Sequence, residues 1–140
     1  MCINENWIIE PPNVLFFALN LNAHHNQTAL TFPESTTDYI SFFGLNEGQF
    51  EKLLEISERK SKQLEGIKDL KITDIAKYIE KRNAINKGFT TSLNLLLIES
   101  QKAAFASYVD MIRLQNQKIR SELTKAGKSE QEIKLAIVEN

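Results

Sequence analysis

The fold is decided by residues 90–126, TTSLNLLLIESQKAAFASYVDMIRLQNQKIRSELTKA. Apolar residues recur here at spacings of three and four, the period of one face of an α-helix. Two series also repeat every seven residues, like the a and d positions of a coiled coil: Leu95, Lys102, Val109, Asn116 and Leu123, and Ile98, Phe105, Ile112 and Ile119. The sequence therefore predicts one long, coiled-coil-like helix over about 90–126.

The two halves of this stretch differ in how widely their apolar residues spread. Before residue 112, several apolar residues lie outside the heptad series, among them Leu93, Leu97 and Tyr108. A helix that is apolar on several sides is enclosed by several neighbours, so we expect the first half inside a small helical bundle. The second half keeps only the narrow seam and is expected to project and pair with one other helix.

Pairing through this seam predicts a homodimer. The seam residues are Val109, Ile112, Asn116 and Ile119. A polar residue at an a position, such as Asn116, can set register and oligomeric state by bonding its symmetry mate. The alternative is that Asn116 and Lys102 face water at the rim of a bundle and that the seam pairs within the chain.

Shorter helices are expected on either side of the long one, over 36–43, 47–64 and 73–86 and again after Gly127. Their first residues follow predicted N-caps, of which Ser35 and Ser129 are each followed three residues later by an acidic residue. Gly88 is expected to interrupt the helical structure between the third helix and the long one. These elements together predict a predominantly all-α fold.

Residues 13–32 fit two structures. Pro11-Pro12 suits the start of a helix. Apolar and polar residues also alternate along the stretch, which is typical of a short β-hairpin turning at residues 24–27. A helix is favoured over the hairpin.

Charge and aromatic content divide the chain. Residues 1–51 contain no Lys or Arg, whereas all 17 basic residues fall in 52–140. Most aromatic residues lie in the first fifty positions. We therefore expect an acidic, aromatic-rich segment over 1–45 that packs on a helical body over 46–140. Because exposed aromatics are favoured at interfaces, Trp7, Phe42 and Phe43 are candidate partner-binding residues.

Recognisable catalytic and cofactor-binding motifs are lacking. The two histidines, His24 and His25, are adjacent and have no third histidine to complete a metal site, and Cys2 is the single cysteine. No glycine-rich phosphate-binding motif occurs. The N-terminal apolar run is too short for a membrane span and does not resemble an export signal. We expect a cytoplasmic protein that is not an enzyme and that needs no cofactor or metal.

Nucleic-acid binding is an alternative function. Residues 71–79, KITDIAKYI, loosely resemble the first helix of a helix-turn-helix domain. That resemblance implies DNA binding, with Lys77, Lys81, Arg82 and Lys87 placed to contact phosphates. The stretch departs from the family because Glu80 stands where the turn glycine is usual, and no hairpin wing follows.

A third reading comes from long helices joined by a short polar link at residues 68–71, which are loosely similar to the phasins of polyester granules. That similarity implies an amphipathic protein that coats a surface. By elimination, the favoured function is protein–protein interaction, as an adaptor, assembly factor or inhibitor that binds the surface of a partner protein.

Overall fold

The computed structural model describes residues 32–140, which form six α-helices and no strand. The all-α prediction is therefore confirmed for this part of the chain. Trp7 and the choice between helix and hairpin over residues 13–31 lie outside the described residues.

The first two helices have the bounds that their capping residues predict. Helix α1 spans Thr36–Phe43, and the Ser35 hydroxyl and the Asp38 carboxylate each accept a hydrogen bond from the other's backbone N–H. Gly44 ends α1 in the left-handed conformation, with a φ of 63°. Helix α2 spans Glu47–Glu65 and begins with a second reciprocal cap between Asn46 and Gln49. Local sequence signals thus set these boundaries correctly.

The prediction that Gly88 interrupts a helix is wrong. After the short helix α3, Leu70–Thr73, helix α4 runs from Ile75 to Leu96 without a break at Gly88. A glycine inside a helix costs only about 1 kcal/mol relative to alanine. Packing of α4 against α2 along its length outweighs that cost.

The prediction of a single long helix over 90–126 is also wrong. The chain leaves α4 at Leu97, which has an extended backbone (φ −83°, ψ 137°), and turns through the 3₁₀ helix η1, Glu99–Gln101. Helix α5 then spans Lys102–Lys125. Leu95 and Ile98, expected on the heptad seam, are 79% and 58% exposed. The heptad series therefore does not follow one face of one helix.

A reciprocal pair of buried amides, Gln49 and Gln101, stabilises this break. Each side-chain NH₂ donates to the other's carbonyl oxygen, at 2.8 and 3.1 Å. Gln49 donates its second N–H to the Leu96 carbonyl at the end of α4, and Gln101 donates its second to the Gly44 carbonyl. The two side-chain oxygens also accept the backbone N–H groups of Asn46 and Ile98. All four N–H groups of the pair are thus bonded to protein atoms.

A lysine also bridges the break. Lys102, in the first turn of α5, donates to the Asn94 side-chain oxygen at 2.8 Å and to the Asn94 carbonyl in the last turn of α4. A cation near the C-terminus of a helix is favourable because the last carbonyls carry partial negative charge. The lysine at this heptad a position therefore bonds within the chain.

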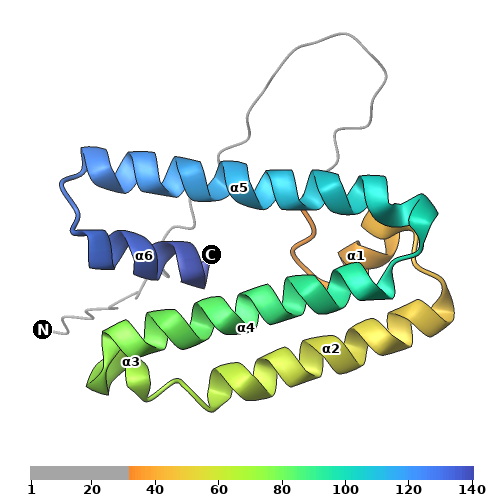
Figure 1. Cartoon of the computed structure of the whole chain (residues 1–140), viewed down its shortest axis with the longest axis horizontal. Helices are drawn as coiled ribbons and strands as arrows, with labels where there is room; N and C mark the ends of the chain where they lie inside the picture. Colours follow the sequence, from red (N-terminus) through yellow and green to blue (C-terminus); the bar gives the residue numbers. More distant parts are fainter. Residues whose placement is uncertain (1–31) are drawn as a thin grey trace, which may run out of the picture.

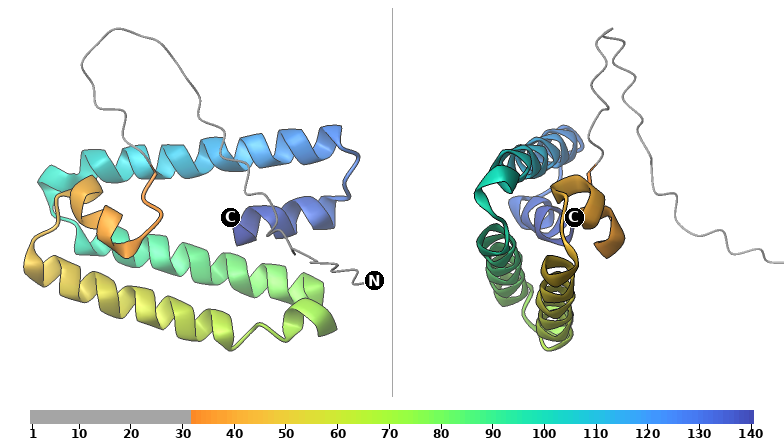
Figure 2. Two further views of the ribbon diagram at one scale, coloured as in Figure 1. Left: turned by 180° about the vertical axis from the view of Figure 1, so that it is seen from behind. Right: turned by 90° about the vertical axis from the view of Figure 1, so that its right-hand side faces the viewer.

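The helices are arranged as an antiparallel α2–α4 pair with α5 returning alongside (Figure 1). Helix α1 and the last helix, α6, Glu130–Glu139, lie between α5 and the α2–α4 pair at opposite ends (Figures 1 and 2). The main core lies at the α1 end and includes Phe42, Phe43, Leu45, Leu53, Phe89, Leu93, Leu97 and Tyr108. Helix α6 adds Ile133 and Val138 at the other end.

Replacing either member of the glutamine pair should destabilise the fold strongly. We expect Gln49→Leu and Gln101→Leu each to lower the free energy of unfolding by about 2–3 kcal/mol, because each leaves buried polar groups unpaired. The double variant should lose less free energy of unfolding than the two single variants lose together. Urea unfolding measures all three, with Gln63→Leu, at an exposed position of α2, as the control. Additive losses would show that the two amides do not act together.

Gly88→Ala should stabilise the protein. A Cβ at this position meets no atom within 4 Å, so the substitution removes backbone freedom without a clash. We expect a gain of about 0.5–1 kcal/mol in the free energy of unfolding. Gly44→Ala is the matched control and should destabilise, because its φ of 63° disfavours a side chain. Destabilisation by Gly88→Ala would mean that α4 is broken at this residue.

Candidate functional site

Helix α6 is attached to α4 through its last turn. Arg82 and Asn86 both donate to the Val138 carbonyl, at 2.8 and 2.9 Å. The Tyr78 hydroxyl donates to the Glu139 carboxylate at 2.9 Å, and Lys71 forms an ion pair with the same group. The bonds from Arg82 and Asn86 satisfy one of the backbone carbonyls that a helix end leaves unpaired. They place α6 between α4 and α5, where it forms one wall of two hollows.

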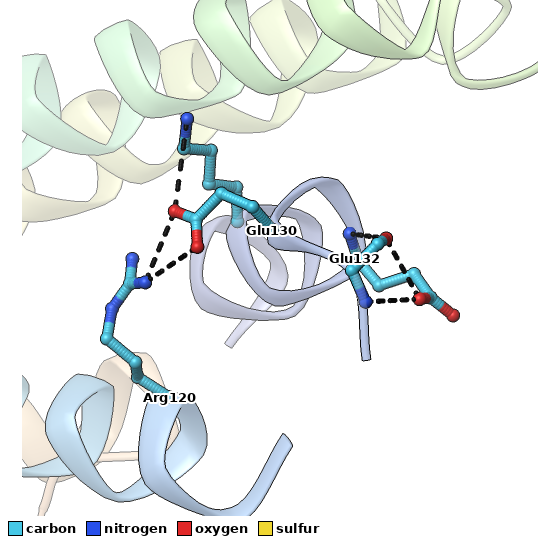
Figure 3. A network of polar contacts seen from close by, with 5 residues as sticks. Arg120, Glu130 and Glu132 are labelled. Atoms are coloured by element: carbon cyan, nitrogen blue, oxygen red, sulfur yellow. Dashed lines mark hydrogen bonds and ion pairs between the residues drawn. The ribbon is translucent and has the colours of Figure 1, made fainter. Parts of the chain in front are cut away.

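The first turn of α6 is attached to α5. The Arg120 guanidinium contacts the Glu130 carboxylate at 3.0 Å (Figure 3). Beside it, the Glu132 carboxylate accepts from the backbone N–H and hydroxyl of Ser129, at 2.8 and 2.9 Å (Figure 3). The predicted capping box of Ser129 and Glu132 is therefore confirmed.

A first hollow, the α5–α6 groove, has a volume of about 430 Å³. Its lining consists of Val109, Ile112, Arg113, Asn116, Gln117, Arg120 and Ile137. The aliphatic members form an apolar floor, and Val109 is 41% exposed. The two arginines and Gln117 give the groove a polar rim.

Three of the four predicted seam residues line this groove, and Ile119 is half-buried nearby in the same helix. Ile137 of α6 lines it together with Ile112 and Asn116. Helix α6 therefore covers part of the seam from within the chain. The exposed part is the side that carries Val109.

A second hollow, the central cleft, lies between α1 and the end of α6 and has a volume of about 620 Å³. Its aromatic lining includes Phe32, Tyr39, Phe89 and Tyr108. The polar lining comes mainly from carboxamides, from Thr90, from the two lysines Lys60 and Lys87, and from Glu34. The cleft thus combines apolar surface with hydrogen-bonding groups and positive charge.

Two tyrosines hold the aromatic side of the central cleft together. The Tyr39 and Tyr108 hydroxyls are 3.1 Å apart, and the Phe32 ring is stacked on Tyr108 with a centroid distance of 5.4 Å. Burial raises the pKa of both phenols above their ordinary value. Both hydroxyls are therefore neutral near pH 7 and act as hydrogen-bonding groups.

Lys60 lies at the edge of the central cleft with its ammonium 4.5 Å from the centre of the Phe89 ring. Burial lowers the pKa of Lys60, and the nearby charge of Arg82 lowers it further. Among the ion pairs formed by residues 32–140, none involves Lys60 or Lys87. Lys60 and Phe89 also line a third hollow, between α2 and α4. The cation is thus partly desolvated and lacks a carboxylate partner in the described chain.

The other predicted site residues fall in several places. Phe42 and Phe43 are 9% and 3% exposed and belong to the core, so they do not form an exposed binding surface. Packing against Tyr108 makes them structural, with ring centroids 6.2 and 5.6 Å from its ring.

The residues predicted for nucleic-acid binding all lie on α4, and Lys77, Lys81 and Lys87 are exposed. Helix α4 continues past Glu80 to Leu96, so residues 71–79 are not followed by the turn that a helix-turn-helix requires. Arg82 is used to hold α6, Lys87 lines the central cleft, and Lys77 and Lys81 are exposed.

The sequence did not predict that the side chains of Lys60, Phe89, Tyr39 and Tyr108 lie close together. They come from α1, α2, α4 and α5, and no local spacing connects them. A burial signal was present for Phe89, which lies four and eight residues before the buried Leu93 and Leu97. No local signal marked Lys60.

No group of three metal-ligating side chains occurs within residues 32–140, and Cys2, His24 and His25 lie outside that range. In the same residues, no helix combines the length and apolar character that a membrane span requires. Comparisons with known protein families, with curated proteins and with solved structures give no match to this chain.

The Glu132 carboxyl should titrate far below its ordinary pKa. The backbone N–H of Ser129, and then its hydroxyl and Lys128, lower this pKa from 4.5 to about 2. Because the folded pKa is depressed, the cap contributes its full stability above about pH 4.5 and loses it as the pH falls towards 2. Carboxyl-detected NMR titration should show this, and Ser129→Ala should raise the pKa, whereas Ser121→Ala should not. A wild-type pKa near 4.5 would contradict the capping geometry.

Proposed function

We propose that this protein acts by binding a partner protein, as an adaptor, assembly factor or inhibitor, and that the α5–α6 groove is the binding surface. The observation that carries the proposal is the apolar floor of the groove, where Val109 is 41% exposed and Arg113, Gln117 and Arg120 line the groove beside it. An apolar centre with a polar, arginine-containing rim is the arrangement found in protein interfaces.

A second copy of the chain is the partner we propose first. In two copies related by a two-fold axis, Val109 of one could pack into the groove of the other, and Asn116 would lie near its symmetry mate. A buried asparagine pair would favour a single register over alternatives. Helix α6 restricts this contact to the open side of the groove.

Self-association is tested by placing a charge on the groove floor. Val109 is partly exposed, so Val109→Asp should leave the fold intact and weaken self-association at least about tenfold, because a carboxylate would replace buried apolar surface. Asn116→Ile should strengthen or redirect association. Analytical ultracentrifugation over a range of concentrations measures both.

Leu114→Asp is the matched control. Leu114 is 56% exposed on the same helix and does not line the groove. It lies five residues from Val109, about 140° around the helix at 3.6 residues per turn. If wild type and Asn116→Ile are both monomers at every concentration, the homodimer is ruled out. Capture of nucleic acid or of lipid vesicles that is insensitive to Val109→Asp would favour the nucleic-acid or surface-coating alternative.

A further inference from the structure

The central cleft contains polar groups whose bonding capacity the fold does not use. Lys60 and Lys87 line it, and neither forms an ion pair with a described carboxylate. Asn83 and Asn116 also line it, and their side chains make no hydrogen bond with other described residues. The neighbouring amides are occupied, since Asn86 donates to the Val138 carbonyl and Gln115 accepts from Asn140.

Lys60 is the strongest evidence that the central cleft binds an anion. Its ammonium is held over the Phe89 ring at 4.5 Å, and burial and Arg82 together lower its pKa. A partly buried cation without a partner carries a desolvation cost that a bound carboxylate would offset. The ammonium takes this position over the ring in the chain alone, without a ligand.

The rest of the cleft fits a polypeptide. A carboxamide carries both a donor and an acceptor, as a peptide unit does, so Asn83 can pair with the backbone of an extended segment. Phe32 and Tyr39, both half-buried, supply apolar surface for one large side chain, and the Tyr39 hydroxyl already bonds that of the buried Tyr108. Glu34 also lines the cleft and disfavours an anionic group beside it, so the carboxylates of the segment are expected at Lys60 and Lys87.

We propose that the central cleft binds an acidic segment of a partner protein, with carboxylates on Lys60 and Lys87 and an aromatic or aliphatic side chain against the half-buried rings of Phe32 and Tyr39. This rests on the proposed function in taking the partner to be a protein. The cleft shares Ile112, Asn116 and Ile137 with the α5–α6 groove. Val109 lines the groove but not the cleft, and Lys60 and Lys87 line the cleft but not the groove.

The test uses the full chain and a short fluorescein-labelled peptide in which glutamate and phenylalanine alternate. Fluorescence anisotropy compares it with the same peptide carrying glutamine in place of glutamate, and with a single-stranded DNA oligonucleotide of equal charge. We expect the acidic peptide to bind more tightly than either. Amide chemical-shift changes confined to residues around Tyr108, Asn83 and Lys60 would place it in the cleft.

Lys60→Met keeps an unbranched side chain and removes the charge, and should weaken binding of the acidic peptide about tenfold or more. Lys52→Met is the matched control, since Lys52 is exposed on the same helix outside the cleft, and should change affinity less than about twofold. Asn83→Asp, at an exposed position, is a second variant that places a like charge at the cleft and should also weaken binding.

Three results would overturn the proposal: equal affinity for the acidic and glutamine peptides, equal losses in Lys52→Met and Lys60→Met, or tighter binding of the oligonucleotide. Val109→Asp separates this proposal from the proposed function. If Val109→Asp abolishes self-association and the peptide still binds through Lys60, both stand. If the peptide binds but Val109→Asp does not change self-association, only the proposed role of the α5–α6 groove is contradicted.

Discussion

The rest of the structure depends on the bonds between the buried side chains of Gln49 and Gln101. They connect the turn after α1 to the break between α4 and α5, two places 52 residues apart in the chain. A buried amide left unpaired costs about 1–3 kcal/mol, so each glutamine is stable in the core only when the other is in place. If α4 and α5 formed one straight helix, α5 could not return alongside the α2–α4 pair, and neither hollow beside α5 would exist.

The short helices α1 and α6 determine the surfaces that follow from this return. They lie between α5 and the α2–α4 pair at opposite ends (Figure 1), and the central cleft lies between them. Helix α6 is fixed by side chains of α4 that bond its last carbonyl and by Arg120 of α5 at its first turn. The positions of both proposed binding surfaces are therefore consequences of packing between helices that are distant in sequence.

Parts of the candidate sites could be predicted from the sequence, and the reason is local periodicity. Val109, Ile112 and Asn116 share one side of α5 because their spacing matches the helical repeat, and they do line one groove. The same method failed for Phe42 and Phe43, whose aromatic character suits an interface and a core equally well. It could not find the contact between Lys60 and Phe89, because the two residues belong to different helices and no spacing relates them.

The sequence by itself determined the helical class and the capped starts of α1, α2 and α6. Ser35, Asn46 and Ser129 act on backbone groups within three residues, so these caps form as predicted. Only the tertiary structure decided that α4 passes through Gly88 and stops at Leu96. Residues 97–101 contain neither glycine nor proline, and each single helical bond there is worth too little to resist long-range packing. Burial of Leu93 and Leu97, together with the hydrogen bonds of Gln49 and Gln101, outweighed the local preference for one continuous helix.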